Sequence, residues 1–483
     1  MRRGFFCIIL IFSVAVACGM ITSCNGIGAL ADDKTVFASD GDGNAVLISV
    51  QGYYGKDAVI PRVSPKGEPV VGVGAEAFAG CGATSVTLPE GVRFIDSRAF
   101  ANCRGITAFH IPDSVTELGT RVFEGCVALE TLTVGNGNPR FRSEKNCIIE
   151  RESGALIYGC GGSVIPDGVT SISGGAFYGA VGLSAADIPE GVVSIGGYAF
   201  YGCSGIEEIH LPDSLESIGN YAFAGCSALT KIAVSPRITA LSEGLFRNCA
   251  SLITVELPNE LTLIGRLAFQ GCASLVDPEF PDSLTEIGGL AFSGCNAFIH
   301  LKIPKNVTVI GDGAFSYCDM LWGIKVDSQN TVYKAKGNCL IRREDGAIVL
   351  GTRGSIIPSD ESVTAIADRA FFGAKFLRNT VIPRNIRTVG REAFYGCDYL
   401  ETVAVLGAAT VGDMAFVNCF TLRTVFISDS VEHMGNSVFE GCVALDEIRM
   451  AFAHIPDSWN TEWNGSGADI LFDCEYNEAE SEE

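Results

Sequence analysis

The sequence is short of positive charge and of histidine. Lysine and arginine number 34 against 56 aspartates and glutamates, and only five histidines occur in 483 residues. The formal net charge of -22 excludes nucleic acid as an expected partner, because phosphate binding needs clustered cations. Five scattered histidines are too few for Ser/His/Asp chemistry. Disorder does not describe the bulk of the chain, since 47% of its residues are hydrophobic.

A long apolar run is also lacking beyond the N-terminus, so we expect no later membrane span. Residues 1–23 are predicted to be a signal peptide, in which two arginines precede an uncharged apolar run. Ile21 to Cys24 resembles the lipobox of bacterial lipoproteins, and Cys24 is the predicted lipidation site. Cleavage after Ala31 and a retained membrane anchor are the alternatives.

Length and self-similarity indicate the architecture. A chain this long exceeds one globular core, so it forms several domains or one repeat array. Phenylalanine is followed three residues later by cysteine in twelve places, and Phe177 and Phe371 continue the series with alanine in the cysteine position. Most steps between these phenylalanines are 22 or 23 residues. The twelve pairs begin at Phe78, Phe100, Phe123, Phe200, Phe223, Phe246, Phe269, Phe292, Phe315, Phe394, Phe416 and Phe439.

One repeat predicts one coil of a solenoid. After Phe200, the residues Ile206, Ile209 and Leu211 have leucine-rich-repeat spacing, and alternation around Ile209 indicates a short strand. Pro212 ends this strand, because proline has no N–H for the ladder. We predict a right-handed, β-rich leucine-rich-repeat solenoid of about 23 residues per coil. One face is a parallel sheet, and short strands, turns or 3-10 pieces form the rest.

Two longer steps and the two ends divide the chain. The steps of 54 and 56 residues exceed two coils by 8 and 10 residues, and β-hairpin inserts are predicted near 136–162 and 328–354. Matching positions of the two hairpins suggest duplication of a larger unit. The expected domains are an N-terminal cap at 32–71, the repeat array at 72–450, and a C-terminal cap with an acidic tail at 451–483.

The repeat resembles the BspA-type leucine-rich repeats of bacterial and protist surface proteins. The resemblance rests on A-F-x-x-C, on pairs such as Leu211-Pro212 and Ile303-Pro304, and on Ile-Gly pairs such as Ile218-Gly219. It covers roughly residues 40 to 460. It implies a surface adhesin that binds host matrix proteins or other cells, and it carries no residue-level binding motif.

Most of the 19 cysteines belong to the repeat and are predicted to be reduced core thiols. Ladder side chains point the same way, and a linear ladder cannot surround a zinc ion, so no metal site is expected. Cys147 and Cys160 differ, because a hairpin centred between Ser153 and Gly154 would place them opposite each other. They are a candidate disulfide, and reduced thiols are the alternative.

The outward side chains of the predicted sheet are the candidate binding surface. Acidic and basic groups lie side by side there, which could orient a protein partner, and a merely soluble face is the alternative. We predict no catalytic residues and no cofactor, with protein ligands on host matrix or other cell surfaces. An envelope scaffold without a host ligand is the alternative function. The candidate residues are Glu208, His210, Lys231, Glu256, Asp277, Glu279, His300, Lys302 and Lys325.

Overall fold

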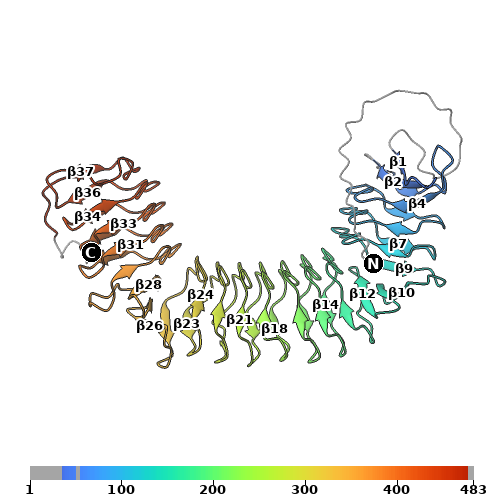
Figure 1. The fold of residues 1–483 in the computed structure, drawn as a ribbon, viewed down its shortest axis with the longest axis horizontal. Helices are drawn as coiled ribbons and strands as arrows, with labels where there is room; N and C mark the ends of the chain where they lie inside the picture. Colours follow the sequence, from blue (N-terminus) through green and yellow to red (C-terminus); the bar gives the residue numbers. More distant parts are fainter. Residues whose placement is uncertain (1–34, 51–54, 477–483) are drawn as a thin grey trace, which may run out of the picture.

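The computed structural model describes residues 35–50 and 55–476, which form a solenoid of β-strands and turns. Over these residues there are 37 strands and no helix. The coils follow one another along an open arch whose N-terminal and C-terminal parts rise on either side of a straighter middle run (Figure 1). The predicted signal peptide, with Cys24 and Ala31, lies outside the described residues.

Longer strands on one side of each coil form five parallel sheets, which together we call the strand face. In chain order these sheets contain β3 (Asp57–Val59) and β5 (Ser85–Thr87); β7 (Ala108–Ile111) and β9 (Thr131–Val134); β14 (Ala185–Asp187), β16 (Glu208–His210), β18 (Lys231–Ala233) and β20 (Thr254–Glu256); β23 (His300–Ile303) and β25 (Gly323–Val326); and β30 (Asn379–Ile382), β32 (Thr402–Val405), β34 (Thr424–Ile427), β36 (Glu447–Met450) and β37 (Asp469–Leu471).

Shorter strands on the returning side of each coil, together with the inserts, form four sheets that we call the return face. They contain β1 (Thr35–Ser39), β2 (Ala45–Val50), β4 (Val70–Val73), β6 (Phe94–Ile95) and β8 (Glu117–Leu118); β10 (Phe141–Glu144), β11 (Cys147–Glu150), β12 (Ala155–Tyr158), β13 (Ser171–Ile172), β15 (Ser194–Ile195) and β17 (Ser217–Ile218); β19 (Ala240–Leu241), β21 (Leu263–Ile264), β22 (Glu286–Ile287) and β24 (Val309–Ile310); and β26 (Tyr333–Lys336), β27 (Cys339–Arg342), β28 (Ala347–Leu350), β29 (Ala365–Ile366), β31 (Thr388–Val389), β33 (Thr410–Val411) and β35 (His433–Met434).

The register confirms the predicted solenoid. Ala186 pairs with Ile209 on the strand face, and Ile195 pairs with Ile218 on the return face, so each strand bonds to its equivalent one coil later. The repeat phenylalanines are buried, and rings in successive coils lie with centroids 4.7 to 6.1 Å apart. This column forms the centre of the core, because no single coil could bury its apolar face alone.

The phenylalanine column is interrupted at two steps. Phe123 contacts Tyr158 edge-on at 5.6 Å, and the core divides there and again near Leu340 into three clusters of buried residues. The bends of the arch lie at the same two places, beside β10–β12 and beside β26–β28 (Figure 1). The inserts therefore mark the points at which one stack of coils gives way to the next.

Each insert contains three antiparallel strands, one more than a hairpin requires. β11 pairs with both β10 and β12, and β27 pairs with both β26 and β28. The two inserts share their polar anchors. Asn138 and Asn330 are buried and donate to equivalent carbonyls of the preceding coil, while Arg151 and Arg343 each donate through Nε to two insert carbonyls. Identical anchors 192 residues apart support duplication of a larger unit.

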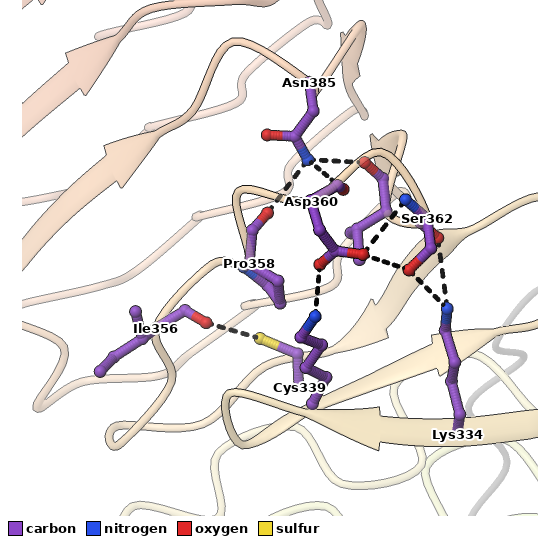
Figure 2. Close-up of polar contacts among 9 residues, drawn as sticks. Lys334, Cys339, Ile356, Pro358, Asp360, Ser362 and Asn385 are labelled. Atoms are coloured by element: carbon purple, nitrogen blue, oxygen red, sulfur yellow. Dashed lines mark hydrogen bonds and ion pairs between the residues drawn. The ribbon is translucent and has the colours of Figure 1, made fainter.

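The second insert is tied to the next coil by charged side chains (Figure 2). Lys334 Nζ donates to Ser362 Oγ at 2.9 Å, and Lys336 Nζ lies 2.8 Å from Asp360 Oδ2. The hydrogen bonds that Asp360 accepts from Lys336 and, second, from Ser362 hold the pKa of the Asp360 carboxyl well below its usual value. Asn385, one coil further along the chain, donates to the Asp360 carbonyl. Asp360 is therefore bound both to the second insert before it and to the coil after it.

Other strands and two tryptophans cover the ends of the core. β1 and β2 form an antiparallel pair, and β2 bonds in parallel to β4, which begins the regular stacking. Trp459 and Trp463 are buried at the other end, and the Trp463 ring lies edge-on to Phe439 with centroids 6.1 Å apart. Both ends of the apolar column are thereby kept from water.

Candidate ligand-binding surface

Seven of the nine predicted binding residues lie on strands of the strand face, Asp277 and Glu279 lie in a break between those strands, and all nine are exposed. Parallel pairing brings residues from different coils together. Glu208 pairs in register with Lys231, and Lys302 pairs with Lys325. Because neighbouring strands lie about 4.8 Å apart, the two lysines form one concentrated basic site.

The strand face is interrupted at Asp277–Glu279, where a regular strand was predicted. That prediction is wrong, since no strand of the strand face forms between β20 and β23. Pro278 stands in the central position and has no N–H for the ladder. Phe280 packs edge-on against Phe292 instead, with ring centroids 5.5 Å apart. The proline was the signal in the sequence that the strand would break.

Asp277 replaces part of the missing ladder. Its Oδ1 accepts the backbone N–H groups of Ile299 at 2.6 Å and His300 at 2.9 Å, and its Oδ2 lies 3.1 Å from His300 Nδ1. Asp277 therefore holds the next coil in place and is only partly available to a ligand. His210 makes a similar contact with Asp187 of the coil that precedes it, with 2.7 Å between His210 Nδ1 and Asp187 Oδ1.

The break leaves a hollow on the strand face. Its volume is about 500 Å³, and its lining includes Glu256, Asp277 and Glu279 beside apolar Phe280. We call this hollow the acidic groove. Among the described residues, no basic side chain forms an ion pair with Glu256 or Glu279. The groove can therefore offer two unpaired carboxylates to a cationic group, with the lysine pair of β23 and β25 beyond it.

Comparison with known proteins identifies the repeat. The family model described as "BspA type Leucine rich repeat region (6 copies)" matches residues 70–145, 162–276, 239–340 and 355–458. The chain belongs to this family. Leucine-rich-repeat arrays of this kind present extended surfaces that typically bind proteins, and they are typically not enzymes.

Solved structures of leucine-rich-repeat proteins are similar to this chain. A leucine rich cell surface protein from Faecalibacterium prausnitzii A2-165 is 21% identical over 95% of this chain and 98% of its own, with a TM-score of 0.45. A leucine-rich repeat protein from Bacteroides ovatus ATCC 8483 is 21% identical over 92% and 99%, with a TM-score of 0.41. A third, from Eubacterium ventriosum ATCC 27560, is 20% identical over 59% and 93%, with a TM-score of 0.43. No curated protein matches the chain.

The cysteines of the BspA-type coils are hydrogen-bond donors, which the sequence did not reveal. Cys203 Sγ donates to the Phe177 carbonyl at 3.0 Å, and Cys249 Sγ donates to the Phe223 carbonyl at 3.2 Å. Equivalent bonds occur from Cys103 onward in every described coil that carries the cysteine. Burial raises the pKa of the Cys249 thiol to about 12. The ladder thus joins successive coils as reduced thiols.

Cys147 and Cys160 are buried free thiols in the structure. The expected register is wrong by one residue at Ile148, which pairs with Tyr158, and by two at Ile149, which pairs with Leu156 after a register shift. As a result Cys147 packs in the middle core cluster and Cys160 in the N-terminal one. A disulfide between them stays a prediction.

Side chains that could bind a metal do not cluster in the described part of the array. No three or more histidine, cysteine, aspartate or glutamate side chains cluster there in a way that could hold a metal. Residues 35–50 and 55–476 also include no helix that is long and apolar enough to span a bilayer. On the strand face of the last coils, Tyr476 packs on Phe426 with ring centroids 5.2 Å apart. A hollow of about 230 Å³ opens beside this contact, over β30, β32 and β34.

Proposed function

We propose that this protein is a non-catalytic, adhesin-like binding protein that recognises protein ligands through the strand face between β16 and β25. Exported chains with this anchor signal would sit on the outer surface of a bacterial cell, held by lipid on Cys24, or would be released after cleavage at Ala31. The ligands would be host matrix proteins or proteins of other cell surfaces.

One observation carries the proposal: the acidic groove lies next to a basic pair on the same open face. Glu256 and Glu279 suit a lysine or arginine of the partner, and Lys302 with Lys325 suits a carboxylate further along. Opposite charges one to three coils apart would fix both the orientation and the register of a bound protein. The binding should weaken as salt is raised, since exposed charges are screened.

The test is a charge reversal of the strand face with a matched control. The full mature protein carrying Glu256→Lys and Glu279→Lys, or Lys302→Glu and Lys325→Glu, would be applied to an array of matrix proteins and glycans. Asp277 is left intact because it bonds to the next coil. Glu286→Lys is the control, since Glu286 is exposed on β22 of the return face.

We expect each strand-face pair to lower the affinity for a captured protein about tenfold or more, with Glu286→Lys unchanged. Unchanged binding by both strand-face variants would remove the strand face as the site. An array that captures nothing would instead favour the envelope-scaffold alternative. Mass spectrometry of the mature N-terminus tests the anchor, and an unmodified start at Asp32 would contradict lipidation of Cys24.

A further inference from the structure

One position of the repeat is small in almost every coil. The fifth residue after the core phenylalanine is large in only three coils, where it is Met320, Phe376 or Tyr399. The three coils begin at Phe315, Phe371 and Phe394, and the second insert lies between the first and the second of them. The small residues elsewhere are Ala83, Gly105, Ala128, Gly182, Gly205, Ala228, Ser251, Ser274, Ala297, Thr421 and Ala444.

The three large residues are exposed and gather around an arginine. Met320, Phe376 and Tyr399 are each 40 to 46% exposed, and the Phe376 and Tyr399 rings are stacked with centroids 5.1 Å apart. Trp322, two residues after Met320, is 50% exposed. The Arg353 guanidinium lies 5.4 Å from the Trp322 ring and 5.8 Å from the Phe376 ring, and its Nη1 lies 3.5 Å from the Met320 sulfur. We call these five residues the aromatic patch.

The first insert shows that the fold does not need the aromatic patch. The inserts are equivalent in their anchors, yet the positions matching the patch hold residues without large apolar groups. Both inserts form three strands with the same pairing and the same register shift. Exposing large apolar side chains has a solubility cost, so such a patch indicates an interaction site. The matching residues are Ala128, Glu130, Gly161, Gly182 and Gly205.

Arg353 lacks a carboxylate partner among the described residues. Its Nε is buried without a hydrogen-bond partner, and so is Asp319 Oδ1. Both residues line a cavity of about 380 Å³ between the coils on either side of the insert. Asp319 is already paired through Oδ2 with Lys375 Nζ at 3.4 Å. The two aromatic rings therefore hold an unpaired cation at the rim of a cavity.

We propose that the aromatic patch docks a protein segment in which a carboxylate side chain lies beside an aromatic or aliphatic one. The carboxylate would pair with Arg353, and the apolar side chain would pack on Trp322, Phe376 and Tyr399. Tryptophan, tyrosine, methionine and arginine are the residues enriched at the centres of protein interfaces. The inference goes beyond the strand-face proposal and uses none of its residues. The aromatic patch would bind a carboxylate, whereas the acidic groove would bind a cationic group.

The probe is a library of displayed 12-residue peptides, selected on the full mature protein. We expect enriched peptides to carry aspartate or glutamate next to an aromatic or aliphatic residue. Synthetic copies would be titrated by tryptophan fluorescence, which reports on Trp322 because Trp459 and Trp463 are buried. Trp322→Glu and Phe376→Gly install the residues of the first copy, and Arg353→Gln removes the charge. Ile253→Ala, another exposed apolar site, is the control.

Trp322→Glu, Phe376→Gly and Arg353→Gln should each weaken binding about tenfold or more, with Ile253→Ala unchanged. Trp322→Glu is followed by anisotropy of labelled peptide, and circular dichroism confirms folding. Peptides that are basic, or that bind the patch variants as well as the original protein, would overturn the proposal. Self-association that Trp322→Glu abolishes, without any peptide capture, would also overturn it by making a second copy the occupant. Failure of the charge-reversal test leaves this result unaffected.

Discussion

Replacing Asp277 separates a structural role from a binding role on the strand face. Asp277→Ala removes the acceptor for two backbone N–H groups, those of Ile299 and His300, at the point where Pro278 breaks the sheet. An N–H left without a partner costs roughly 1–3 kcal/mol when buried. The Asp277 side chain is 37% exposed, so water can replace part of the bond. We therefore expect a loss of about 1–2 kcal/mol in the free energy of unfolding.

The matched variant is Asp277→Asn, which keeps an oxygen at the same position and loses the charge. Hydrogen exchange of a peptide covering residues 296–303 is the direct measurement. Exchange should accelerate in Asp277→Ala and stay close to the original rate in Asp277→Asn, while urea unfolding follows the same order. Equal exchange in all three proteins would refute the assignment of Asp277 to the ladder. A faster rate in both variants would show that the charge, and not the acceptor, holds the next coil.

Three further predictions concern the core and its polar contacts. Phe246→Ala, in the middle of the column, should cost about 3–5 kcal/mol in chemical unfolding, because the ring is fully buried and stacked on both sides. A thiol reagent should label Cys474 and leave Cys249 unmodified in the folded protein, since burial raises the pKa of the Cys249 thiol to about 12. Arg369 holds the pKa of Glu392 below its usual 4.5, so the stability from this pair is full above that value and is lost as acid protonates the carboxylate. Glu392→Gln should flatten the pH dependence of the unfolding midpoint below pH 4.5.

A specific result would contradict each of these three predictions. A Phe246→Ala variant within about 1 kcal/mol of the original protein would mean that the column contributes little to cohesion between coils. Rapid labelling of ladder cysteines in the folded state would mean that the coils open locally on the time scale of the reagent. If the unfolding midpoint of Glu392→Gln falls with acid as steeply as that of the original protein, other carboxylates account for the loss of stability at low pH.

The solenoid could be predicted because its signal is repeated in every coil. Phe223 or Ile209 alone indicates little, but a fixed spacing of apolar residues leaves only a stack of equivalent coils that buries them. The strand face followed from the same alternation, and the prediction failed where one coil departs from it, at Pro278. Averaging over coils hides such a departure, since the pattern says nothing of how a single coil compensates through a side chain such as Asp277.

Contacts between coils were the other limit of the sequence. The cysteine of each repeat was expected to be a small apolar group, because spacing within one coil does not show which carbonyl lies above it. The cavity beside Arg353 depends on how two stacks meet at an insert, and no local pattern encodes that meeting. The aromatic patch did have a sequence signal, the three large residues in a small-residue position. Comparing one repeat position across all coils, and not along one coil, would have found it.

The two inserts show why binding surfaces can change on this scaffold at little cost to folding. Anchors such as Asn138 and Asn330 are alike because they satisfy buried backbone carbonyls, and losing one leaves unpaired polar groups. The patch positions point to solvent, and each coil is held only by its neighbours, so Gly182 in one copy and Phe376 in the other are both compatible with the stack. Selection for a ligand can therefore act on these positions independently of stability. On this reasoning, exchanging the patch residues for those of the first copy should change what the protein binds far more than how firmly it folds.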